Sequence, residues 1–186
     1  MTPELAAKVV RGGRKAPLWS PSPTTREVRH ERDAITRLLP HREPFLFVDA
    51  IDAIDLEQAA IRGTRTIDPA DPIFAGHFPS APIYPGVLLL ETMGQLGICL
   101  ADFLVRGSVE VPPDTKPRDV RALHIHAATF QSPVMPGDRL VVLATALERD
   151  DFGAICAGQI LKTTTSSNSA EAIAAVAVME VYFVEA

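Results

Sequence analysis

The sequence predicts an α+β fold in which an antiparallel sheet wraps around one long, buried helix. Two observations support this prediction: a single apolar helical stretch covers residues 86–105, and at least five strand-like segments, most of them consecutive, make up much of the remainder. The connections between consecutive strands are short enough for hairpins, whereas parallel strands need long crossover connections. An antiparallel sheet around a helix is therefore favoured over a doubly wound parallel sheet.

The central helix is predicted from the absence of proline and the spacing of apolar residues across residues 86–105. Leu89, Met93 and Leu96 recur at helical spacing, and further leucines and isoleucines widen the apolar surface around most of the circumference. Pro85 lies just before this stretch, where proline is tolerated close to a helix start. We expect a helix that is buried on most sides.

The other elements are predicted from β-branched, aromatic and apolar segments that end at turn residues. A short helix is expected from Arg32 to Leu39, where Pro40 stops it. Strands are expected over Phe45 to Ile54, Ala59 to Ile67, Val120 to Phe130, Arg139 to Arg149, Ala154 to Thr165 and Glu171 to Glu185, with a turn at Ser166 to Ser169.

The N-terminal segment mixes glycine, proline, serine and arginine, a composition that favours an extended arm over a packed element. We expect a basic, proline-rich arm over residues 1–29 and a folded domain over residues 30–186. Residues 1–42 hold nine Lys and Arg against four Asp and Glu, a net charge of +5, and residues 43–186 hold nine against nineteen, a net charge of −10. Such an arm can attract an acidic partner, although a solvated tail without a partner is commoner.

Composition indicates one globular domain, because 47% of the 186 residues are hydrophobic and 22% are charged. Cys99 and Cys156 lie in apolar surroundings and are expected to be reduced core residues. The acidic body argues against a nucleic-acid partner. We identify neither an uninterrupted apolar run of roughly 20 residues, as a membrane span requires, nor a signal peptide, so a cytoplasmic location without membrane contact is expected.

Residues capable of acid–base chemistry lie around the start of the predicted central helix. His77 belongs to an eleven-residue segment, residues 76–86, that holds three prolines and two glycines, and the helix presents Glu91 and Gln95 at i, i+4 spacing. An apolar setting raises the pKa of a carboxyl group, so Glu91 is expected to hold a proton near neutral pH. A histidine beside aromatic residues is more often a packed core residue, and a helical glutamate usually faces solvent.

The segment from His77 to Gln95 resembles the active-site signature of the beta-hydroxyacyl-acyl carrier protein dehydratases of fatty-acid synthesis. That signature reads His-Phe-Pro, then Pro-Val-x-Pro-Gly-Val-Leu, then Glu and Gln, and its spacing matches this chain without a gap. The stretches from Leu39 to Asp49 and from Phe130 to Leu140 agree as well. The resemblance covers most of residues 35–185.

This resemblance implies the hotdog fold and a lyase that removes water from a 3-hydroxyacyl thioester to give a trans-2-enoyl thioester, in fatty-acid or specialised polyketide-like biosynthesis. The partner would be an acyl carrier protein that holds the substrate on its phosphopantetheine arm, and neither a cofactor nor a metal is implied. It also implies a homodimer with joined sheets, in which His77 of one protomer faces Glu91 of the other. Dimers of the family often associate into hexamers, which is left open for this chain.

By the same resemblance, His77 would remove the C2 proton and Glu91 would protonate the departing 3-hydroxyl group. The Gly86 backbone N–H, at the start of the helix, would stabilise the thioester oxygen. The Ile83 carbonyl would orient the His77 ring, and Gln95 would steady Glu91. A sister group that also isomerises the double bond carries aspartate at the position of Glu91, so the glutamate favours a plain dehydratase.

The substrate tunnel would be lined by Phe78, Tyr84 and Pro85, and Tyr84 is bulkier than the usual aliphatic residue. Gln131 and Ser132 occupy a place where the family usually has basic residues, near the mouth that receives the phosphopantetheine arm. The N-terminal arm could compensate for the missing charges through its own basic residues, which are Lys8, Arg11, Arg14, Lys15, Arg26 and Arg29.

Two alternative functions remain open from the sequence. One is a hotdog acyl thioesterase in which Glu91 activates water, although the intact His77 segment argues against it. The other is a non-catalytic acyl-binding subunit. His124 and His126, expected on one face of a strand, could serve a metal, but no third ligand of obvious placement appears.

Overall fold

The computed structural model describes residues 1–163 and 172–184. In chain order, its elements are α1 (Pro3–Gly13), β1 (Arg26–Glu31), α2 (Arg32–Leu38), β2 (Ala50–Asp55), β3 (Ala60–Thr66), the 3₁₀ helix η1 (Pro72–Ala75), α3 (Gly86–Arg106), β4 (Val120–Phe130), β5 (Arg139–Arg149), β6 (Gly153–Thr163) and β7 (Ala172–Phe183). The expected turn at Ser166 to Ser169 lies outside the described residues.

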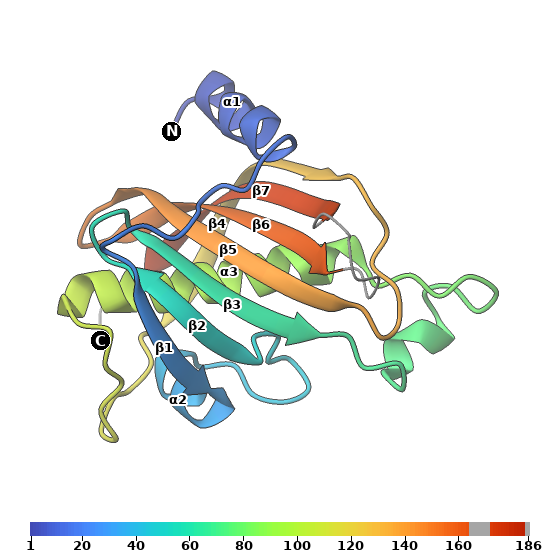
Figure 1. Ribbon diagram of the computed structural model, residues 1–186, viewed down its shortest axis with the longest axis horizontal. Coiled ribbons are helices and arrows are strands. Elements are labelled where there is room, and N and C mark those ends of the chain that lie inside the picture. The colour runs from blue at the N-terminus through green and yellow to red at the C-terminus, as the bar shows by residue number, and fades with distance from the viewer. Residues whose placement is uncertain (164–171, 185–186) are drawn as a thin grey trace.

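The described strands form one seven-stranded sheet in the order β1-β2-β3-β5-β6-β7-β4, and every neighbouring pair is antiparallel. The sheet curves around α3, which lies along its inner face (Figure 1). The predicted α+β architecture, an antiparallel sheet around a central helix, is confirmed. Strand β4 forms one edge of the sheet and β1 forms the other.

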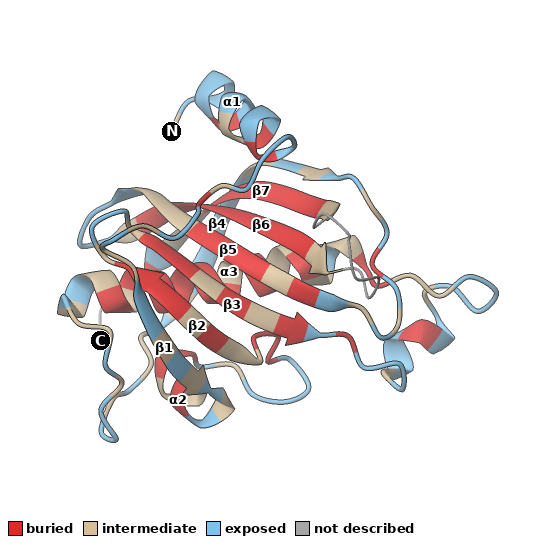
Figure 2. Cartoon of the chain, in the orientation of Figure 1, coloured by how far each residue is buried: buried red, intermediate tan, exposed pale blue. Residues whose placement is uncertain are grey.

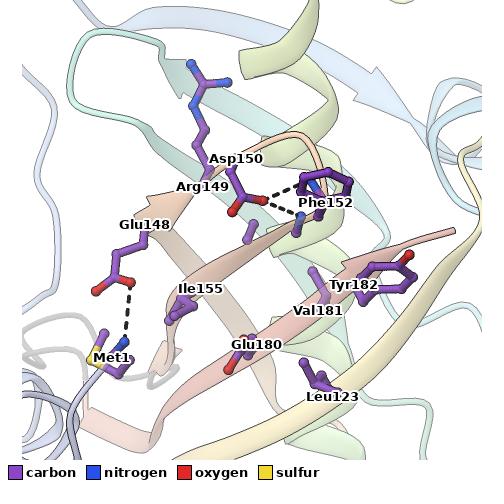
Figure 3. A pocket seen from close by; sticks show the side chains of 12 residues that line it. Met1, Leu123, Glu148, Arg149, Asp150, Phe152, Ile155, Glu180, Val181 and Tyr182 are labelled. Carbon is purple, nitrogen blue, oxygen red and sulfur yellow. Dashed lines mark hydrogen bonds and ion pairs between the residues drawn. The ribbon is translucent and has the colours of Figure 1, made fainter. Parts of the chain in front are cut away.

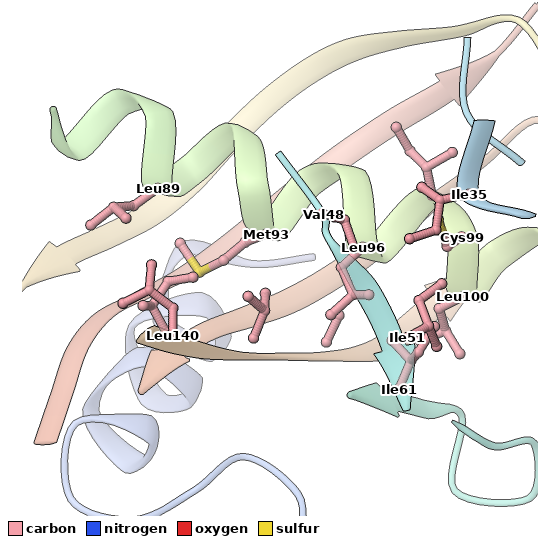
Figure 4. Packing of buried hydrophobic residues seen from close by; sticks show 14 of the residues in the cluster. Ile35, Val48, Ile51, Ile61, Leu89, Met93, Leu96, Cys99, Leu100 and Leu140 are labelled. Carbon is pink, nitrogen blue, oxygen red and sulfur yellow. The ribbon is translucent and has the colours of Figure 1, made fainter. Parts of the chain in front are cut away.

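α3 forms the centre of the hydrophobic core. It begins directly after Pro85 and ends before Gly107, whose φ of 61° is the left-handed conformation that closes many helices. Its buried side packs on the sheet through Leu89, Met93 and Leu96 (Figure 4), and burying each such side chain contributes roughly 1.5–3 kcal/mol.

The close approach of α3 to the sheet depends on a glycine in β6. A Cβ atom at Gly158 would lie 2.6 Å from the Cβ of Met93, so a larger residue would force the helix away.

Among the described residues, α3 alone is long and apolar enough to cross a membrane, contrary to the expectation that no run reaches that length. Most of this helix is buried, as expected for a core helix. In Figure 2 the strands that lie over it are coloured largely red, which marks buried residues.

The expectation of an extended conformation over residues 1–29 is wrong. Pro3–Gly13 forms helix α1, capped by the Thr2 side chain, and Arg26–Glu31 pairs with β2 as the edge strand of the sheet. α1 lies on the outer face of the sheet, opposite α3 (Figure 1). The boundary that we expected after residue 29 falls inside this strand.

The other elements lie close to their predicted positions. The helix after residue 31 and the five strands from β3 to β7 begin within a residue or two of the expected bounds. β2 instead begins at Ala50, five residues later than predicted, because Gln95 takes the hydrogen bonds of Phe45 and Phe47. Both cysteines are free and buried as predicted, and burial raises the pKa of the Cys156 thiol to about 12.

Candidate active site

His77 lies in a loop that is held in place by hydrogen bonds of the His77 backbone. The His77 N–H donates to the Ile73 carbonyl of η1 at 3.0 Å, and the His77 carbonyl accepts from the Ile83 N–H at 3.1 Å. Nδ1 of the His77 ring lies 2.8 Å from the Ile83 carbonyl oxygen. A carbonyl can only accept, so Nδ1 carries the hydrogen, and Nε2 of the neutral ring is left as the proton acceptor.

A cavity of about 440 Å³ opens beside His77. It lies between the His77 loop, the start of α3 and residues 130–134, and the Tyr84 N–H joins two of these walls by donating to the Val134 carbonyl at 2.7 Å. A Cβ atom at Gly86 would lie 2.9 Å from the Phe130 ring. Glycine therefore lets this aromatic ring pack against the first residue of the helix.

Glu91 lies on α3, one turn further along, and two side chains hold its carboxylate. Gln95 Nε2 donates to Glu91 Oε1 at 2.9 Å, and His41 Nε2 lies 3.3 Å from the same oxygen. Gln95 is fully buried and also accepts from the Phe47 N–H at 2.8 Å and donates to the Phe45 carbonyl at 3.0 Å. One amide group thus joins α3, the carboxylate and the loop before β2.

The expectation that the pKa of Glu91 is raised is wrong for the single chain. Burial raises this pKa. The hydrogen bonds from His41 and Gln95 and the charge interaction with His41 together lower it by more than burial raises it, so the net shift is downward. The Glu91 side chain is 32% exposed, and solvent therefore reaches the carboxylate. An apolar helix alone does not determine the charge state of Glu91.

His41 is the residue of this site that sequence reasoning did not single out. Its ring stacks on Phe45 and lies within reach of Glu91. The signal was available, because His41 belongs to the stretch from Leu39 to Asp49 that resembles the dehydratases. What the sequence could not supply was the fold of the loop that turns His41 toward α3.

Comparison with known proteins places this site in a family. The model of the FabA-like domain matches residues 39–183, which is most of the chain. The chain belongs to the FabA-like domain family. It is 41% identical to the 3-hydroxyacyl-acyl-carrier-protein dehydratase FabZ of Aliarcobacter butzleri over 114 residues, which cover 61% of this chain and 75% of that protein. The FabZ of Campylobacter jejuni is 45% identical over 106 residues, which cover 57% of this chain and 69% of that one.

Solved structures agree on the fold. The dehydratase heterocomplex ApeI:P from Xenorhabdus doucetiae aligns with a TM-score of 0.59 and 17% identity, over 81% of this chain and 91% of that one. An acyl-CoA hydrolase mutant from Staphylococcus aureus in complex with coenzyme A aligns with a TM-score of 0.52 and 15% identity, over 70% and 67% of the two chains. Both dehydratases and hydrolases share this fold, which the resemblance predicted as the hotdog fold.

The FabA-like chain does not bring His77 and Glu91 into one cavity. Glu91 and His41 line a second cavity of about 260 Å³, bounded by α3, β4 and β7, and His77 is not among its lining residues. Val87 lines both cavities and is 68% exposed. Within one chain, the two residues therefore lie on either side of Val87.

The three residues expected to line a substrate tunnel occupy different environments. Tyr84 lines the His77 cavity with part of its surface but is otherwise buried in the core against Phe74. Pro85 is buried directly before α3. Phe78 is 51% exposed and stacks on the His77 ring at a centroid distance of 4.1 Å.

A third cavity, of about 400 Å³, is lined by none of these three residues but shares Glu180 and Val181 with the Glu91 cavity. Figure 3 shows Phe152 and Tyr182 at its wall and the N-terminus of Met1 paired with Glu148 at 3.3 Å. Nearby on β4, His126 pairs with Glu180 at 2.7 Å. Within residues 1–163 and 172–184, no group of three His, Cys, Asp or Glu side chains is arranged to hold a metal ion.

Proposed function

We propose that this chain is a 3-hydroxyacyl-acyl-carrier-protein dehydratase of fatty-acid biosynthesis, with His77 and Glu91 as its base and acid. One observation supports the proposal most strongly. In a chain that shares more than 40% identity with FabZ dehydratases, the Nδ1 atom of His77 is fixed by the Ile83 carbonyl and the Glu91 carboxylate by Gln95. The acyl group would arrive as a thioester on the phosphopantetheine arm of the carrier.

The proposed reaction is an elimination that needs one base and one acid. Nε2 of His77 takes a proton from C2, the electron pair of that C–H bond forms the C2–C3 double bond, and the C3–O bond breaks. Glu91 gives its proton to the departing hydroxyl group, which leaves as water. The Gly86 N–H, at the positive end of α3, stabilises the charge that develops on the thioester oxygen.

We propose that a second copy of the chain completes the site, because each copy holds His77 and Glu91 in separate cavities. β4 is an edge strand, and its Leu123 and Ile125 side chains are more than half exposed. Pairing of two β4 edges would cover these apolar side chains and bring His77 of one copy toward Glu91 of its partner. Cover by the partner would also remove solvent from Glu91 and raise the pKa of its carboxyl group, as an acid catalyst requires.

We also propose a cytoplasmic location, which the proposed pathway and the burial of α3 in the core support. The chemistry is tested by incubating the protein with a 3-hydroxyacyl thioester on acyl carrier protein and analysing the product by mass spectrometry. We expect loss of one water with the acyl group still attached to the carrier. Release of free acid would indicate a hydrolase, and an unchanged substrate would indicate a binding subunit.

The same assay tests the two assigned residues. His77→Ala and Glu91→Gln should each lower the rate by about 10²–10⁴-fold, which is the usual contribution of a positioned acid or base. Circular dichroism and gel filtration should match the unaltered protein. A variant that retained near-normal turnover would remove its residue from the proposed mechanism.

A further inference from the structure

Helix α1 lies outside the FabA-like region and carries a concentration of positive charge. Lys8, Arg11, Arg14 and Lys15 lie on or just after this helix and are all exposed. Its one acidic residue, Glu4, lies in the first turn at the opposite end. The C-terminal end of α1 is therefore strongly basic, although residues 43–186 carry a net charge of −10.

α1 is firmly placed on the sheet. Its small apolar side, Ala6 and Val10, packs on Val176 and Val178 of β7, which face away from α3. The fully buried Gln159 of β6 then fixes the chain that follows the helix.

Gln159 makes three hydrogen bonds to this segment. Its Nε2 atom donates to the carbonyls of Gly13 at 2.6 Å and Ala16 at 3.0 Å, and its Oε1 atom accepts from the Leu18 N–H at 2.9 Å. A buried amide with three satisfied bonds holds its partners in a defined position. The basic end of α1 is thus a fixed surface of the molecule.

This basic end lies at the rim of the His77 cavity. Arg14 Nε donates to Gln131 Oε1 at 2.8 Å, and Gln131 Nε2 donates back to the Arg14 carbonyl at 3.3 Å. Gln131 and Ser132 line the same cavity as His77. Figure 1 shows the end of α1 beside the connection that leaves β4.

Among the described residues that line this cavity, none is a lysine or an arginine. Gln131 and Ser132 are uncharged, and Lys162, which donates to the Pro133 carbonyl, is already paired with Asp138 at 3.0 Å. Through Arg14, α1 therefore brings positive charge to an entrance whose own lining residues include no lysine or arginine.

We propose that the basic end of α1, formed by Arg11, Arg14 and Lys15, is the surface on which an acyl carrier protein with an acidic face docks as its acyl arm enters the His77 cavity. This inference rests on the proposed dehydratase function. An acidic carrier would be repelled by the acidic body of this chain, so a local positive surface at the entrance guides its approach.

The test compares one acyl group on two carriers. The triple variant Arg11→Gln, Arg14→Gln, Lys15→Gln is assayed with a 3-hydroxyacyl thioester on acyl carrier protein and with the same group on N-acetylcysteamine, which is neutral. At low salt we expect kcat/KM for the carrier-bound substrate to fall about tenfold, mainly through KM, because charges at an interface rim act on association. The loss should shrink as salt screens the charges, and the neutral thioester should be unaffected.

A matched control removes the same charge elsewhere. The variant Arg26→Gln, Arg29→Gln, Lys116→Gln alters three exposed side chains on β1 and after α3. Arg26 and Arg29 were expected to share the docking role of the arm, but β1 lies at the opposite edge of the sheet from β4, which leads to the rim. The activity of this variant should therefore equal that of the unaltered protein on both substrates. Adding Gln131→Arg to the α1 triple variant should restore part of the lost rate, because it returns a positive charge to the rim.

Equal losses on both substrates, or no loss at low salt, would overturn the docking proposal. Thermal unfolding of each variant distinguishes a lost surface charge from a detached helix, because detachment would expose Gln159 and lower the melting temperature. Failure of the dehydratase proposal itself looks different, since the unaltered protein would then dehydrate neither substrate.

Discussion

The two halves of the candidate site are held in different ways. The His77 ring is oriented by a carbonyl only six positions away, within one loop that prolines stiffen. The Glu91 carboxylate depends on Gln95, whose other partners Phe45 and Phe47 lie 50 and 48 positions away in sequence. It also depends on His41 from the same distant loop. One half is local, and the other is assembled by the fold.

This difference explains why the two halves respond differently to their surroundings. His77 receives its orientation and its tautomer from backbone atoms, which side-chain substitutions elsewhere do not remove. The charge state of Glu91 is a balance between burial, which raises its pKa, and the contacts of His41 and Gln95, which lower it. Changes in the loop before β2 should therefore alter the acid and leave the base intact.

The largest effect on the assembled half is expected from Gln95→Leu. This change leaves the buried Phe47 N–H without a partner, which should cost about 1–3 kcal/mol in the free energy of unfolding. It also frees the Glu91 carboxylate, so kcat should fall by roughly 10–100-fold. Urea unfolding and steady-state kinetics measure the two effects.

Thr92→Val is the matched control, because Thr92 is buried on the same helix but its hydroxyl donates only to the Leu88 carbonyl within α3. It should change kcat little. If Gln95→Leu behaved like this control, the joining of α3 to the loop would have no part in holding Glu91.

A smaller effect is expected from His41→Phe, which keeps a ring against Phe45 but removes the contact with Glu91. We expect kcat to fall roughly tenfold, because the carboxylate loses part of its orientation. The pKa of Glu91 should rise, since a lowering contact is gone. An acid must be protonated to act, so the alkaline limb of the pH–rate profile should move to higher pH, while the acid limb, assigned to the base, should stay in place.

The position of that alkaline limb is decisive for His41. A limb that stayed where it is in the unaltered protein, with kcat reduced, would mean that His41 merely supports the loop. A limb that moved to lower pH would contradict the assigned acid role of Glu91.

The sequence predicted the elements that have strong local signals. Strands β3 to β7 are rich in apolar and β-branched residues, and α3 shows helical spacing over its whole length, so their bounds were predicted closely. The contact between His77 and the Ile83 carbonyl lies within one short motif and was expected from the resemblance. The contact between Glu91 and His41 was not expected, because it depends on how a distant loop folds over α3.

α1 was missed for a related physical reason. Its buried side consists of Ala6, Val10 and Gly13, which give a weak apolar pattern, and Gly12 with the following prolines favoured an extended chain. The helix is stabilised by the outer face of the sheet and by Gln159, both far away in sequence. Deleting residues 1–29 would remove most of β1 as well as α1, so surface substitutions test the arm more cleanly.

Two chains should share each active site, and mixing two inactive variants shows whether they do. His77→Ala and Glu91→Gln chains are unfolded together, refolded together and assayed for dehydration. A mixed dimer holds one site with both an intact His77 and an intact Glu91. Random pairing should therefore restore about a quarter of the unaltered activity. A mixture as inactive as either variant alone, despite dimers in gel filtration, would contradict the shared site.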